Sequence, residues 1–110
     1  MQKRTRNGTT FTESSGNVFA DMGLPNADEL LFKADLVIAI TKVIERHGWT
    51  QSQAAKRAGI DQPKISALLS GALRGFSVGR LLKILIRFGQ DVEIRVLDSK
   101  TAVGSVNVAA

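Results

Sequence analysis

The stretch Gln51–Gly71, QSQAAKRAGIDQPKISALLSG, decides the fold, because its apolar spacing and its glycines predict two short helices joined by a tight turn. Thr50 and Gln53 have the spacing of a capping box, which predicts that the first helix begins directly after Thr50. The same helix is expected to end at Gly59, because a residue without a Cβ atom adopts the left-handed conformation of a turn without strain.

The second helix of the pair is predicted to begin after Asp61, which is placed to cap it, and to end at Gly71. Pro63 is tolerated because the first turn of a helix needs no backbone donor. Ala55 suits the crossing of the two helices, where the backbones approach closely. The apolar residues expected to close one small core are Ala54, Ala55, Ala58, Ile60, Ile65, Leu68 and Leu69, and the side chains left outside on the second helix are Gln62, Pro63, Ser66, Ala67 and Ser70.

The pattern Q-x-x-x-A-x-x-x-G-I from Gln51 to Ile60, followed by Ile65-Ser66 and by Gly71, resembles the helix-turn-helix of the Cro/phage-repressor (XRE) family. This resemblance covers roughly residues 36–89. It implies a mostly α, five-helix, lambda-repressor-like domain that binds double-stranded operator DNA.

A longer resemblance covers residues 18–97 and is to HigA-like antitoxins of toxin–antitoxin modules. It rests on VFADMGLPNADELLFKADL ahead of the helix pair and on GRLLKILIRFGQDVEIRV behind it. It implies a protein that binds a basic RelE/HigB-like toxin and represses its own operon. A stand-alone or phage-type repressor without a toxin remains the alternative, since both classes share the helix-turn-helix.

The first resemblance also assigns DNA contacts, because the second helix of such a pair lies in the major groove with its N-terminal residues against base edges. Gln62 matches a position that can bond adenine, whereas Pro63 departs from the polar residue often found there. Arg80 is added because it is the basic residue nearest the start of the following helix. The expected base contacts are Gln62, Pro63, Ser66 and Ala67, and the expected phosphate contacts are Gln51, Lys64, Arg74 and Arg80, of which Lys64 could also reach a guanine.

Charge is concentrated on the same segment. The chain of 110 residues carries a net charge of +5, and residues 49–90 alone carry +6, from seven basic residues and one acidic residue. Such a patch is expected for a protein that neutralises DNA phosphates, although a solvated basic face is the common alternative. The absence of cysteine favours a reducing compartment, and with no membrane-length apolar run or secretory signal we expect a cytoplasmic, nucleoid-associated bacterial protein.

The N-terminal part of the chain divides into a polar tail and an apolar segment. Residues 1–16 are expected to be disordered, and their basic residues form either a minor-groove arm or a loose tail. Residues 17–24 are too apolar for a free tail and too short for a stable helix, so they pack on the body or on a partner.

The long helix Asn26–His47 is predicted from a cap at Asn26 and from Gly48 at its end. Its apolar arc is broader than a surface helix needs, and residues 17–47 carry a net charge of −2. An acidic, apolar segment suits a basic toxin. The expected toxin contacts are Phe19, Leu24, Leu31 and Phe32.

Two further features concern the packing behind the helix pair. Trp49 is expected to join the long helix to the helix-turn-helix by packing, and His47, the only histidine, to cap the helix end. Ser77 is predicted to cap a last helix that runs to Phe88 and ends at Gly89. The residues expected to fill its inner face are Val78, Leu81, Leu82, Leu85, Ile86 and Phe88, with Ile84 towards a neighbour.

The segment Asp91–Asp98, DVEIRVLD, alternates apolar and polar residues and predicts a β-strand. An isolated strand is unstable, so we expect it to pair with the same strand of a second subunit through Val92, Ile94 and Val96, which gives a two-fold homodimer. Pairing with residues 17–20 of the same chain is the alternative. Residues 17–98 therefore form one domain, and the low-complexity residues 99–110 are expected to be a disordered tail.

An enzyme is not expected. The serine, lysine and aspartate residues form no catalytic constellation at a recognisable spacing, and the length leaves no room for an appended protease domain. We assign no catalytic residue, no metal site and no cofactor.

Overall fold

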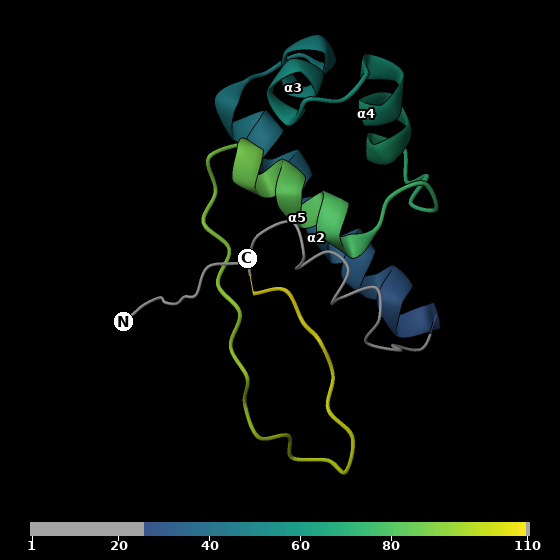
Figure 1. Ribbon diagram of the computed structural model, residues 1–110, viewed down its shortest axis with the longest axis vertical. Helices are drawn as coiled ribbons and strands as arrows, with labels where there is room; N and C mark the ends of the chain where they lie inside the picture. Colours follow the sequence, from purple (N-terminus) through teal and green to yellow (C-terminus); the bar gives the residue numbers. More distant parts are fainter. Residues whose placement is uncertain (1–25, 110) are drawn as a thin grey trace.

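The computed structural model describes residues 26–109, which form a bundle of four α-helices followed by a long extended segment (Figure 1). The helices are α2 (Asn26–His47), α3 (Gln51–Ala58), α4 (Gln62–Leu69) and α5 (Val78–Arg87). Helices α3 and α4 pack on each other, and α5 lies along α2 and against α3. The mostly α helix-turn-helix prediction is confirmed, whereas the five-helix count is not confirmed by the described residues.

Helix α3 begins and ends as its sequence predicts. The Thr50 hydroxyl accepts a hydrogen bond from the Gln53 amide at 3.1 Å, and the Gln53 side chain accepts one from the Thr50 amide at 2.8 Å. Gly59 ends the helix with φ of 73°. The capping box and the glycine turn are therefore both confirmed.

Replacing Thr50 by alanine is expected to lower the free energy of unfolding by about 0.5–2 kcal/mol, because the Gln53 amide loses its acceptor. Urea unfolding followed by circular dichroism measures the change. The adjacent Ser52 is exposed in the same first turn, so Ser52→Ala is the matched control and should change stability by less than about 0.5 kcal/mol. A serine at position 50 should restore most of the loss.

The predicted cap residues of α4 and α5 both lie at the start of their helices, but only one of them caps through its side chain. Ser77 caps α5, since its hydroxyl accepts from the Arg80 amide at 3.1 Å. Asp61 has the extended backbone of a cap residue at the start of α4, but its side chain makes no capping hydrogen bond. Asp61 therefore lies at the predicted N-cap position, but the predicted capping by its side chain was wrong.

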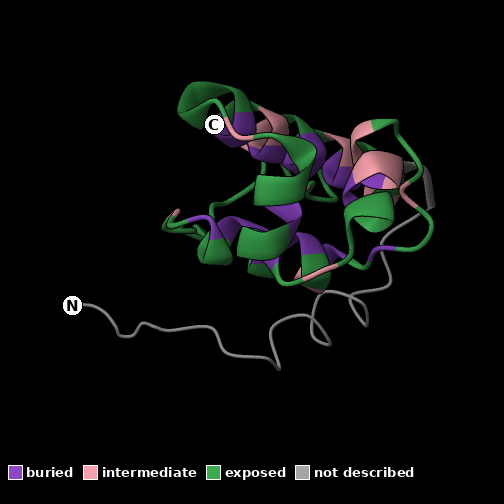
Figure 2. Ribbon diagram, turned by 90° about the horizontal axis from the view of Figure 1, so that it is seen from above, coloured by how far each residue is buried: buried purple, intermediate pink, exposed green. Residues whose placement is uncertain are grey.

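The core lies where the inner sides of the four helices meet, and the buried residues are coloured purple in Figure 2. Ala55 is buried, as the close approach of α3 and α4 requires, whereas Ile60 and Leu69 are only partly buried. The buried apolar residues are Phe32, Leu36, Val37, Ile40, Val43, Ile44, Ala54, Ala55, Ala58, Ile65, Leu68, Phe76, Val78, Leu81, Leu82, Ile84, Leu85 and Phe88.

The inner face of α5 differs from the prediction at two isoleucines. Ile84 is 3% exposed and belongs to the core, whereas Ile86 is 51% exposed. Ile84 lies three residues after Leu81 and four before Phe88, which places all three on one helical stripe. Ile86 falls outside that stripe, so the predicted roles of Ile84 and Ile86 are reversed.

Trp49 connects the end of α2 to α3, as predicted, and it also contacts the end of α5. Its ring stacks on His47 with centroids 4.4 Å apart, and it meets the Phe88 ring edge-on at 5.1 Å. The Arg57 guanidinium lies 4.4 Å from the centroid of the Trp49 ring, a cation–π contact that the sequence did not suggest. These contacts connect the ends of α2 and α5 to α3.

The predicted β-strand at 91–98 is not formed within the described residues 26–109. The segment is extended and exposed, and it has no strand to pair with in this part of the chain. The chain then turns and comes back to the helices, where Val106 and Val108 pack against the core (Figure 1). The predicted tail at 1–16 and the alternative pairing with residues 17–20 lie outside the described residues.

Candidate nucleic-acid interface

Helix α4 is attached to the bundle by one side and presents the other to solvent. Ile65 and Leu68 are completely buried, and they hold the helix on the core. Gln62 and Pro63, at its N-terminal end, are exposed, and Ser66 and Ala67 are half-buried beside them. The four residues predicted to contact bases therefore lie on one short helix, and none of them is fully buried.

The end of α4 is closed by hydrogen bonds that leave its outer side unobstructed. The Ser70 hydroxyl donates to the Ser66 carbonyl at 2.8 Å, and the Gly71 amide donates to the Leu68 carbonyl at 3.0 Å. Gly71 has φ of 93°, so the chain leaves the helix in a conformation that favours glycine. The chain then continues through a short loop to α5.

The residues predicted to contact phosphates lie within α4 or near it in the sequence. All four are exposed. Gln51 is the first residue of α3, where amide groups of the first turn point outward. Lys64 lies on α4, and Arg74 lies in the loop that follows it. An exposed helix start and an exposed basic loop are arrangements that suit a phosphate backbone.

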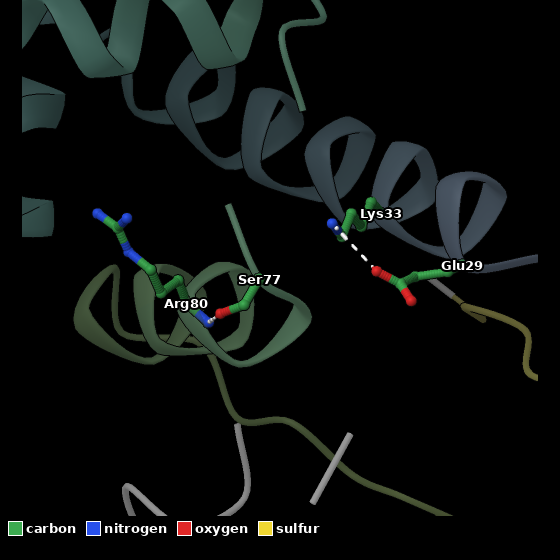
Figure 3. A network of polar contacts seen from close by, with 4 residues as sticks. All are labelled: Glu29, Lys33, Ser77 and Arg80. Carbon is green, nitrogen blue, oxygen red and sulfur yellow. Dashed lines mark hydrogen bonds and ion pairs between the residues drawn. The ribbon is translucent and has the colours of Figure 1, made fainter. Parts of the chain in front are cut away.

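Arg80 is held more tightly than the other three. Its guanidinium donates to the Gly75 carbonyl at 3.2 Å and lies 5.1 Å from the centroid of the Phe76 ring. Figure 3 shows its side chain extending away from the capped start of α5. The side chain is therefore positioned by the loop between α4 and α5.

The charge of this region is not balanced by ion pairs among the described residues. The ion pairs between residues of the described range are Glu29–Lys33 and Glu93–Arg95, each with an N–O distance of 3.2 Å, and both lie outside residues 49–90. Figure 3 shows the first of them, along α2. Residues 49–90 carry a net charge of +6, which favours an anionic partner.

The residues predicted for protein contacts lie elsewhere. Val92, Ile94 and Val96 are exposed on the extended segment that follows α5. Leu31 is 66% exposed on α2, whereas Phe32 is 6% exposed and belongs to the core, unlike the exposed position expected of a toxin contact. Phe19 and Leu24 lie outside the described residues.

No metal or membrane feature accompanies this interface in residues 26–109. No group of three or more histidine, aspartate or glutamate residues is close enough to hold a metal ion within that range. None of the helices described there is long and apolar enough to cross a membrane.

Comparison with known proteins identifies the fold family. A model of the helix-turn-helix domain family matches residues 18–97. A solved structure named XRE Family Transcriptional Regulator is 42% identical in sequence, with a TM-score of 0.74, and the match covers 78% of this chain and 99% of that one. The chain belongs to the XRE helix-turn-helix family. The comparison with curated proteins gives no significant match.

Membership of the XRE helix-turn-helix family fits the geometry of α3 and α4. The capping box, Ala55 and Gly59 lie at the positions where this motif needs a helix start, a small side chain and a turn. The family assignment thus confirms the XRE resemblance of the sequence. It does not by itself distinguish an antitoxin from another regulator.

Proposed function

We propose that this protein is a sequence-specific DNA-binding transcriptional regulator that reads operator DNA with α4. The observation that carries the proposal is the attachment of α4, whose Ile65 and Leu68 are buried while Gln62 and Pro63 remain exposed. An eight-residue helix held in this way has short outer side chains that do not obstruct entry into a major groove. The name of the 42% identical structure, a transcriptional regulator, supports the same function.

Within this proposal the contacts divide into two kinds. Gln62 bonds the edge of an adenine, Ser66 makes a less selective bond, and Ala67 contacts a thymine methyl group. Gln51, Lys64, Arg74 and Arg80 bind phosphates and fix the register of the protein on the duplex. Pro63 contributes shape and no hydrogen bond.

A homodimer completes the proposal. The alternating residues of 91–98 have exposed backbone and exposed Val92, Ile94 and Val96, which a matching strand of a second copy would cover. Two copies related by a two-fold axis carry two α4 helices, which suits an inverted repeat with half-sites about one helical turn apart. Sedimentation equilibrium of the full chain tests the dimer, and a monomer at every concentration would exclude it.

The DNA function is tested by a gel shift with the DNA upstream of the protein's own gene. Specific binding is expected with a dissociation constant of about 10⁻⁸–10⁻¹¹ M, at least about 10³-fold tighter than for unrelated DNA. Equal affinity for both duplexes at every salt concentration would show that the protein does not read sequence. Footprinting of the shifted complex then locates the half-sites.

An antitoxin role is the finer part of the proposal, and the outer side of α2 supports it. Leu31, Asp35 and Ile38 recur at helical spacing, and all three are exposed. An exposed apolar and acidic stripe suits a basic partner such as a RelE/HigB-like toxin. Without a toxin, the same protein would act as a stand-alone repressor.

Replacing Leu31 by glutamate is expected to weaken binding to such a toxin at least about tenfold, because Leu31 is the most exposed large apolar residue of the stripe, at 66%. The measurement is co-purification of the two full-length proteins, followed by calorimetry. Leu97→Glu is the matched control, since Leu97 is also exposed, at 78%, but lies on the extended segment. Unchanged toxin binding by Leu31→Glu would remove α2 from the interface, while DNA binding by both variants should persist.

A further inference from the structure

A cavity of about 250 Å³ lies behind the turn between α3 and α4, and it is open to solvent. One wall is the turn itself, with Ala58, Gly59 and Ile60, and the other wall is α5 with Ile84. Arg80, Lys83 and Arg87 complete the lining, and no lining residue is acidic. The three basic residues are three and four positions apart on α5, so they share one face of that helix.

Arg87 is fixed across the turn. Its Nε donates to the Arg57 carbonyl at 3.3 Å, which joins the end of α5 to the end of α3. A Cβ atom at Gly59 would lie 2.9–3.1 Å from the Arg87 guanidinium, so the guanidinium fits there only because Gly59 has no side chain. The charge of Arg87 is therefore held against the helix-turn-helix turn.

Arg80, which also lines the cavity, is fixed by the Gly75 carbonyl and the Phe76 ring. Each guanidinium carries five N–H donors, and the described contacts of Arg80 and Arg87 use one donor of each. Both arginines bond neutral groups of the protein. The remaining donors are thus pre-positioned for an anion at little cost in side-chain entropy.

We propose that this cavity binds a phosphate group. A tetrahedral oxyanion can accept hydrogen bonds from two guanidinium groups, and arginine matches the geometry of phosphate oxygens. A volume of about 250 Å³ is smaller than the range of about 300–1,000 Å³ typical of drug-sized ligands, so a compact group fits better than a large one. The phosphate belongs either to the DNA backbone or to a free phosphorylated molecule.

Amide NMR of the full chain, titrated with inorganic phosphate at constant ionic strength, tests the site. Saturable shifts are expected at Gly59, Ile60 and Ile84, with chloride at the same ionic strength causing none. Arg87→Gln and Arg80→Gln should each weaken phosphate binding by about tenfold, because each removes a charged pair of donors. Arg95→Gln is the matched control, since Arg95 is exposed, pairs with Glu93 and does not line the cavity.

The source of the phosphate is identified by repeating the titration with a DNA duplex bound. If the DNA backbone fills the cavity, added phosphate no longer shifts the three amides; if a free phosphorylated molecule fills it, the shifts persist. Shifts that do not saturate, that spread over all basic residues, or that remain unchanged in Arg87→Gln and Arg80→Gln would overturn the proposal. Because the titration of the free protein needs no operator, it can fail while sequence-specific DNA binding is confirmed, and the reverse also holds.

Discussion

Replacing Ile65 by alanine is expected to lower the free energy of unfolding by about 2–5 kcal/mol, the range for removing a buried aliphatic side chain from a packed core. Ile65 is 0% exposed, and together with Leu68 it holds α4 on the bundle. An eight-residue helix is not stable in isolation, so its attachment depends on these contacts. A single truncation should therefore affect the whole domain, because a small domain has only about 5–15 kcal/mol of stability.

Chemical denaturation in urea measures this loss, and Ile86→Ala is the matched control. Ile86 is exposed on α5, so the same change there should cost less than about 0.5–1 kcal/mol. Ile65→Ala should also bind DNA more weakly, because it is less stable. Ile86→Ala should bind DNA as well as the unchanged protein does. Equal stability of the two variants would mean that α4 is not held by the core as described.

The second large effect concerns the difference between residues that contact bases and residues that contact phosphates. Replacing Gln62 by alanine is expected to cost about 1–3 kcal/mol of discrimination at one base pair of the operator, with little change in affinity for unrelated DNA. Replacing Arg74 by alanine is expected to weaken binding to both kinds of DNA about equally and to reduce the salt slope by roughly one. The difference arises because Gln62 is exposed at the start of α4, whereas Arg74 lies in the loop beyond it.

Binding isotherms over a range of salt concentrations, with operator and unrelated duplexes, measure both quantities. Lys100→Ala is a control for charge alone, because it removes one positive charge from an exposed residue outside the helix-turn-helix. If Gln62→Ala and Arg74→Ala lost specificity to the same extent, the assigned roles would be wrong. A loss of specificity in Arg74→Ala alone would exchange the two roles.

Local sequence signals were sufficient for the helix-turn-helix. Thr50, Gly59 and Ser77 fix helix ends through short-range chemistry, and each does so where its neighbours in sequence require it. The exposed start of α4 was also predictable, because Ile65 and Leu68 assign one face of the helix to the core. Caps, turns and helical periodicity depend on residues within a few positions of one another.

The sequence contains enough information to place Ile84 and Ile86 correctly, but the prediction for these two residues was wrong. Leu85 lies between them in the apolar run ILI, residues 84–86, in which composition does not distinguish the faces. Only the spacing to Leu81 and Phe88 shows that Ile84 belongs to the buried stripe. The lesson is that helical spacing should take precedence over apolar character on a short amphipathic helix.

Features that depend on distant residues were not predictable. Arg87 lines the cavity behind Gly59 and donates to the Arg57 carbonyl, thirty positions away in sequence. The predicted strand at 91–98 needs a partner strand, and residues 26–109 of one chain contain none. Whether residues 91–98 pair as a strand depends on a second subunit, and the alternation of apolar and polar residues in one chain does not determine this.

The return of the C-terminal residues to the helices has a consequence for how readily two copies could join. Residues 91–105 leave α5 at one end and are fastened again where Val106 and Val108 meet the core, so they form a closed loop and not a free end. Ordering a backbone residue costs about 1–2 kcal/mol, and a loop whose ends are already fixed has fewer conformations to surrender than an untethered chain. Strand exchange between subunits would therefore cost less conformational entropy, because the fold already restricts residues 91–105.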